Sequence, residues 1–165
     1  MRLYLVRHGL AVDRDDPQCP PDAERPLTPK GLKKTRAAAE GFRALEIEPD
    51  VVLTSPWLRA AQTAEIFCEV LGFPLNKIVR TDALKGDSNP TDLFRELAKL
   101  KAQEVVCFGH EPHLHQVIGA VLNPGATIPE LKKAGMAFLD LQRVSPPRGK
   151  LLALYPAKTL RLLSK

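Results

Sequence analysis

The sequence predicts an α/β fold of three layers, in which helices cover both faces of a mainly parallel central sheet. Two observations predict it. Short, continuously apolar runs such as "LYLV" and "VVCF" are typical of strands that are buried on both faces. Segments with apolar residues at helical spacing alternate with these runs along the chain. The length of 165 residues, without a repeat or low-complexity run, predicts one domain over residues 1–165.

The first elements are a strand over residues 2–8, a polar loop over residues 13–27 and a helix capped by Thr28. Pro29 stands in the first turn of this helix, where a missing N–H costs nothing. The helical spacing predicts a buried stripe formed by Leu32, Thr35, Ala39, Phe42 and Leu45.

The later elements continue the alternation of strand and helix. In chain order we predict a strand at 50–55, a helix from Ser55 to Gly72, a short strand in "KIVRT", a helix over about 90–101, a strand at 104–110 and a helix over about 112–122 that ends at Asn123-Pro124-Gly125. "GMAFLDLQR" and "KLLALYP" alternate in polarity, which favours two late strands that pair.

Four basic side chains fall where strands end. Arg7 and His8 close the first strand, Arg59 lies one turn into the helix after the second, and His110 closes the fourth. Ligands of open α/β sheets bind at the carboxyl ends of the strands, so these residues are expected around one crevice. Arginine forks suit phosphate oxygens, a neutral histidine can attack phosphorus, and a protonated one can neutralise charge in the transition state. The pattern therefore points to phosphate chemistry.

Net charge, apolar segments and cysteine count limit the classes of partner and the cell compartment that the sequence favours. The net charge of +5 favours an anionic partner but is too small and scattered to indicate nucleic acid. No segment is apolar for long enough to span a membrane, and the N-terminus does not read as a signal peptide. Cys19, Cys68 and Cys107 are odd in number and far apart, which favours reduced thiols in the cytoplasm and argues against zinc.

"LVRHG", "TSPWLRAAQT" and "FGHEP" resemble, in order, the signature segments of the histidine phosphatase superfamily with its phosphoglycerate-mutase-like fold. "ERPLTPKG" is similar to a segment of its small branch, the SixA-type phosphohistidine phosphatases, and the resemblance covers residues 2 to about 122. It implies that His8 accepts the phosphate and that Arg7, Arg59 and His110 bind the phosphoryl group. Arg25 would be a further contact at the rim. No cofactor is implied, and a phosphohistidine-bearing protein is the expected partner.

The sequence departs from the larger family at one point. Phosphomonoesterases and mutases of that family usually carry a glutamate after the third strand as general acid. "TDALKGDSNP" offers only Asp82 and Asp87 there; Asp87 is a candidate donor, and its alternative is a solvated loop carboxylate. The small branch also tends to lack a clear acid. We therefore expect a phosphatase acting on phosphohistidine in proteins. The alternatives are a mutase or small-metabolite phosphomonoesterase on the same fold, and a phosphate-recognising module without turnover.

Two further motifs fail on chemical grounds. "CPPDAER" fits the C-x5-R loop of cysteine phosphatases, but its prolines lack N–H groups and its acids repel an anion. "HEPHLH" places histidines at i, i+3 and i+5, which does not match the H-E-x-x-H metal motif. His113 and His115 are therefore expected on the helix surface or at the rim, and no metal site is predicted.

Overall fold

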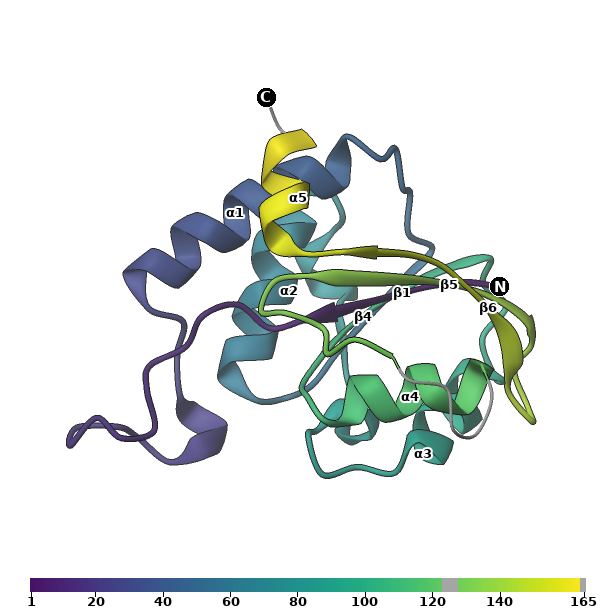
Figure 1. Ribbon diagram of the computed structural model, residues 1–165, viewed down its shortest axis with the longest axis horizontal. Coiled ribbons are helices and arrows are strands. Elements are labelled where there is room, and N and C mark those ends of the chain that lie inside the picture. Colours follow the sequence, from purple (N-terminus) through teal and green to yellow (C-terminus); the bar gives the residue numbers. More distant parts are fainter. Residues whose placement is uncertain (123–127, 164–165) are drawn as a thin grey trace.

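A computed structural model describes residues 1–122 and 128–163, so the predicted helix end at Asn123-Pro124-Gly125 lies outside the described residues. Six strands form one sheet in the order β3-β2-β4-β1-β5-β6 (Figure 1). The strands are β1 (Arg2–Arg7), β2 (Val51–Thr54), β3 (Val79–Arg80), β4 (Glu104–Gly109), β5 (Met136–Arg143) and β6 (Arg148–Tyr155). The first four are parallel, whereas β5 runs antiparallel to β1 and to β6. The prediction of a mainly parallel sheet with two late pairing strands is confirmed.

Helices cover both faces of this sheet, which confirms the three layers. They are α1 (Pro29–Arg43), α2 (Leu58–Leu71), α3 (Pro90–Leu97), α4 (His113–Leu122) and α5 (Ala157–Leu163), with single 3₁₀ turns at Asp22–Glu24, Leu75–Lys77 and Asp82–Leu84. On one face α1 packs against α2 and α5, and on the other α3 packs against α4 (Figure 1). Among the described helices, none has the length and apolarity needed to cross a bilayer.

The strand β1 lies inside the sheet and contributes side chains to the apolar clusters on both of its faces. Leu3 and Leu5 belong to the apolar cluster on the α3/α4 side, while Tyr4 and Val6 belong to the cluster on the α1/α2 side. Burying an aliphatic side chain of this size stabilises the fold by about 1.5–3 kcal/mol. Because both of its faces are buried, β1 reads in the sequence as a continuous apolar run.

Local differences from the expected elements have physical reasons. Thr28 caps α1 as predicted, since its side chain accepts from the N–H of Gly31 at 3.0 Å. The prediction that Leu32 belongs to the buried stripe of α1 is wrong, because Leu32 is 41% exposed. The second helix begins at Leu58 instead of Ser55, because the chain stays extended through its cap, Trp57. The third helix ends at Leu97.

The helix α5 was not predicted from the sequence, and it depends on contacts made far along the chain. A Cβ built on Gly41 of α1 would lie 1.7 Å from the carbonyl oxygen of Leu160 in α5. Only glycine lets the backbones of these two helices approach so closely. The short C-terminal helix is therefore held by its packing on α1.

The register of the parallel strands brings three segments to one edge of the sheet. Arg7 pairs with Gly109 and Thr54 with Phe108. Just beyond these pairs, the backbone N–H of His8 donates to the Gly109 carbonyl at 3.0 Å. The carboxyl ends of β1, β2 and β4 therefore lie level, as the predicted site requires.

Candidate active site

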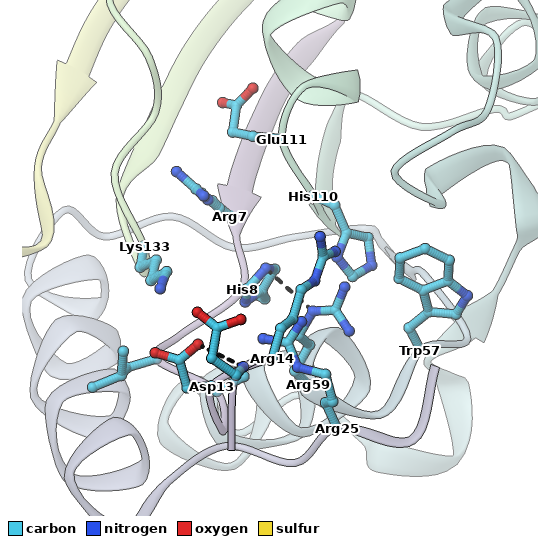
Figure 2. A pocket seen from close by; sticks show the side chains of 13 residues that line it. Arg7, His8, Asp13, Arg14, Arg25, Trp57, Arg59, His110, Glu111 and Lys133 are labelled. Carbon is cyan, nitrogen blue, oxygen red and sulfur yellow. Dashed lines mark hydrogen bonds between the residues drawn. The ribbon is translucent and has the colours of Figure 1, made fainter. Parts of the chain in front are cut away.

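A pocket of about 450 Å³ opens at this edge of the sheet (Figure 2). It is lined by all four residues that the sequence predicted to converge, Arg7, His8, Arg59 and His110, and also by Arg25. The rest of its wall is formed by Leu10, Ala11, Asp13, Arg14, Asp15, Trp57, Glu111 and Lys133. The structure thus brings the predicted side chains into one strongly basic cavity.

The imidazole of His8 is oriented by the backbone directly after it. Its Nδ1 lies 2.7 Å from the carbonyl oxygen of Gly9, so Nδ1 carries the proton and donates. The lone pair is left on Nε2, which accepts a hydrogen bond from Nε of Arg59 at 3.3 Å. Burial, together with the charges of Arg59 and Arg7, lowers the pKa of His8 to about 3, although the contact with Gly9 opposes this. His8 is therefore neutral at physiological pH, as a nitrogen nucleophile must be.

Arg59 projects from the first turn of α2 and is only 2% exposed. Its Nη1 donates to the backbone carbonyl of Asp22 at 2.5 Å, and its Nη2 donates to Oδ2 of the same residue at 3.2 Å. Trp57 lies beneath the guanidinium, with the ring centroid 4.8 Å from Cζ. If that lone pair on His8 bonded to phosphorus, the Arg59 Nε–H would be released to donate to a phosphoryl oxygen.

His110 stands beside His8, with 5.0 Å between the ring centroids. Its Nε2 lies 2.9 Å from the hydroxyl oxygen of Ser55, while its buried Nδ1 has no partner among the described residues. Burial, and then the neighbouring His8 and Arg59, lower the pKa of His110 to about 2. The ring is therefore neutral at physiological pH. A bound phosphoryl dianion would favour the protonated form, because an opposite charge raises the pKa of an imidazole.

Arg7 is held at its outer end. Its Nη1 donates to Oε1 of Glu130 at 2.9 Å and to the carbonyl oxygen of Leu131 at 2.8 Å. Its buried Nε has no partner among the described residues. Arg7 therefore keeps an unused donor within a side chain whose position is fixed.

Arg25 reaches the pocket from the loop before α1. Its Nε donates to the carbonyl oxygen of Val12 at 3.0 Å, and its Nη1 donates to Oδ1 of Asp22 at 2.7 Å. Burial works to raise the pKa of Asp22, but the hydrogen bond from Arg25 and the charge of Arg59 outweigh it and lower that pKa to about 2. The Asp22 carboxylate is therefore ionised beside two buried guanidinium groups.

The loop that carries Asp22 and Arg25 is closed at its base. Ala11 and Leu27 form an antiparallel bridge, and the N–H of Val12 donates to the Pro26 carbonyl at 2.9 Å. The Leu27 N–H donates to Oε1 of Gln62 in α2 at 2.8 Å. These contacts fix the loop against the helix that supplies Arg59.

Several residues of the site were not found from the sequence. Trp57 stands two positions before Arg59, and an aromatic residue so close to a candidate arginine is the stronger of two sequence signals. The weaker signal is the position of Asp22, three residues before Arg25. Ser55 was assigned only to a helix start, and Lys133 reaches the pocket from the segment before β5, with no local motif to mark it.

Two predicted residues lie elsewhere. Asp87 is exposed and is not among the residues that line the pocket. The expectation for His113 is wrong: it is fully buried, and neither of its ring nitrogens has a partner among the described residues. Burial lowers its pKa. Within residues 1–122 and 128–163, no three His, Cys, Asp or Glu side chains gather as metal ligands.

Comparisons with known proteins find relatives that cover most of the chain. The model of the histidine phosphatase superfamily (branch 1) matches residues 3–85. The chain is 36% identical over 147 residues to an uncharacterized protein of Picosynechococcus sp., with 84% of each chain covered. It is 29% identical over 144 residues to the phosphohistidine phosphatase SixA of Escherichia coli, with 86% of each covered. A structure of the protein histidine phosphatase SixA complexed with tungstate superposes with a TM-score of 0.85 at 25% identity, covering 97% of this chain and 99% of the other.

Proposed function

The chain belongs to the histidine phosphatase superfamily (branch 1), and we propose that it is a phosphatase that forms a phosphohistidine on His8 and takes its phosphate from phosphohistidine in proteins. The observation that carries this proposal is the orientation of His8. Its Nδ1 proton is tied to the Gly9 carbonyl, and Nε2 faces the guanidinium of Arg59.

The reaction has two displacements at phosphorus. In the first, the lone pair on Nε2 of His8 forms the N–P bond, and the bond to the leaving group breaks. The departing group takes its electron pair and a proton from solvent. In the second, water attacks the phosphorus and gives a proton to solvent, and the bond to Nε2 breaks so that its electron pair returns to the His8 ring. Arg7 and Arg59 stabilise the phosphoryl oxygens throughout, and His110, protonated beside the dianion, adds a donor.

The chemistry of the leaving group favours phosphohistidine over a phosphate ester of an alcohol as the substrate. The 3₁₀ turn Asp82–Leu84 and the following Gly86 and Asp87 supply no residue to the pocket wall. An alkoxide needs a proton from a general acid, a form of catalysis worth about 10²–10⁴-fold. An imidazole, with an unperturbed pKa of about 6.5, leaves with far less help. A site that lacks an acid at this position favours the nitrogen leaving group.

The covalent intermediate is the direct test. Rapid quenching with a ³²P-labelled substrate should trap label that is lost in acid and kept in base, and His8→Ala should abolish both labelling and turnover. His115→Ala, which removes a histidine outside the pocket, should leave both intact. Near-normal turnover by the His8→Ala protein would refute the mechanism. Phosphate binding without turnover by the unaltered protein would instead favour the phosphate-recognising module.

Substrate class needs a separate comparison. We expect a phosphohistidine-bearing protein, and activated aryl phosphates after it, to be hydrolysed faster than serine or sugar phosphates. Equal rates for a sugar phosphate and a phosphohistidine protein would favour the small-metabolite phosphomonoesterase.

A further inference from the structure

Beside the pocket, the carboxylate of Asp22 is shared by the guanidinium groups of three arginines. Asp22 is not among the residues that line the pocket; with Arg14 and Arg25 it lines an adjoining hollow. Oδ1 of Asp22 accepts from Arg25 Nη1 at 2.7 Å and from Arg14 Nε at 3.1 Å, while Oδ2 accepts from Arg59 Nη2 at 3.2 Å. The backbone carbonyl of Asp22 also accepts from Arg59. The buried Arg59 and Arg25 suit a site that binds phosphate. The Asp22 carboxylate beside them does not, because its negative charge would compete with phosphate.

The members of this cluster differ in their freedom to move. The side chains of Arg59 and Arg25 are 3% and 10% exposed, whereas that of Asp22 is 37% exposed. Asp22 opens a single 3₁₀ turn that has no side-chain cap. The guanidinium groups are therefore fixed by packing, and the carboxylate is the partner that can turn toward solvent.

The carboxylate also meets Arg59 on the edge that a phosphoryl group would use. The Nε–H and one Nη2–H of a guanidinium point the same way and form the fork that binds phosphate oxygens in pairs. In the structure, Nε of this fork faces Nε2 of His8 and Nη2 faces Oδ2 of Asp22. A phosphoryl group bonded to His8 would compete with Asp22 for the second position.

We infer that Asp22 is a positioning residue that sets how tightly the pocket holds phosphate. Its carboxylate occupies one position of the Arg59 fork, yields that position to a phosphoryl oxygen when substrate binds, and retakes it as inorganic phosphate leaves. The inference rests on the proposed function, because it assumes that a phosphoryl group is handled at His8. In this role Asp22 promotes the release of inorganic phosphate, the product.

The test is the affinity for inorganic phosphate, measured by titration calorimetry on the full chain without any turnover. Asp22→Asn keeps the shape and one oxygen acceptor for Arg25 but removes the charge that competes with phosphate. We expect its dissociation constant for phosphate to fall about fivefold or more, since a like charge beside a bound ion strongly weakens binding. In steady-state assays with an aryl phosphate, kcat and KM should fall together as product release slows.

Two variants serve as controls. Glu24→Gln removes an equal charge from the same 3₁₀ turn, at an exposed residue outside the pocket wall, and should change the phosphate affinity by less than about twofold. Asp22→Glu keeps the charge on a longer side chain and should restore an affinity near that of the unaltered protein.

An unchanged or weaker affinity in Asp22→Asn would overturn the inference and leave Asp22 as a structural brace. An equal gain in Glu24→Gln would also overturn it, since the effect would then be one of general charge. If Asp22→Asn fails to fold, Asp22→Ser removes the same charge and should also lower the dissociation constant for phosphate; an unchanged constant in that variant refutes the inference. Because calorimetry needs no hydrolysis, the inference is tested even if the unaltered protein binds phosphate but turns nothing over.

Discussion

The two neutral histidines of the pocket make the stability of the fold depend on pH. Burial lowers the pKa of His8 to about 3 and that of His110 to about 2, well below the ordinary value. Below about pH 6.5 the unfolded chain therefore binds protons that the folded chain does not. The stability that these histidines provide is complete above that pH. It is lost as the pH falls toward the pKa values of the folded state.

The size of the effect follows from these pKa values. At about pH 5, an unfolded histidine with a pKa of about 6.5 gains roughly 2 kcal/mol from protonation, and a folded one with a pKa of about 3 gains almost nothing. Between about pH 8 and about pH 5, His8 and His110 together should lower the free energy of unfolding by about 4 kcal/mol. This is a large part of a typical folding free energy. Burial also raises the pKa of Glu111, which acts in the opposite direction.

A variant isolates the contribution of His8 from that of every other group. Urea unfolding followed by far-ultraviolet circular dichroism gives the free energy of unfolding at each pH. Between about pH 8 and about pH 5, His8→Asn should lose about 2 kcal/mol less than the unaltered protein. An identical loss in the two proteins would show that His8 is not held neutral by the fold. The argument for a neutral nucleophile would then fail.

Further predictions concern the site and the helix packing. Arg59→Ala should lower kcat/KM about 100- to 1,000-fold, because in the proposed mechanism its guanidinium would contact the phosphoryl group in ground and transition states alike. A loss below about threefold would contradict that role for Arg59. EDTA should leave the activity unchanged, and recovery of a lost activity with a divalent ion would contradict this. Rates on aryl phosphates should fall steeply as the leaving-group pKa rises, and Asp87→Asn should not alter the slope; a slope that steepens in this variant would identify Asp87 as the acid. Gly41→Ala should destabilise the fold by about 1–3 kcal/mol in urea unfolding, because its Cβ would collide with α5. Gly119→Ala in α4 would meet only Cδ1 of Ile128, at an ordinary contact distance of 3.9 Å, and should be neutral or stabilising.

The fold and the meeting of the four basic residues could be predicted because both depend on local signals. Apolar runs mark strands that are buried on both faces, and parallel strands bring their carboxyl ends to one edge. His8 and His110 follow such runs directly, so their proximity follows from the topology. The same logic places Arg59, one turn into the next helix.

What the sequence did not reveal depends on contacts between distant segments. The burial of His113 is set by how α4 packs on the sheet, and an isolated helical pattern does not show it. Leu32 fits the apolar spacing of α1 but lies at the margin of its buried face, 41% exposed. The position of Asp22 over Arg59 depends on the path of an irregular loop, for which no periodicity exists.

The closed base of the loop over residues 13–26 separates two tasks within one site. His8 follows a central strand that is hydrogen-bonded to neighbours on both sides, whereas Arg25 and Asp22 belong to an irregular loop that is closed at its base and tied to α2 through Arg59. The closure entropy of such a loop grows only slowly with its length. Descendants of this chain can therefore lengthen or exchange the segment, and so acquire new substrates, while the strand that presents His8 stays unchanged.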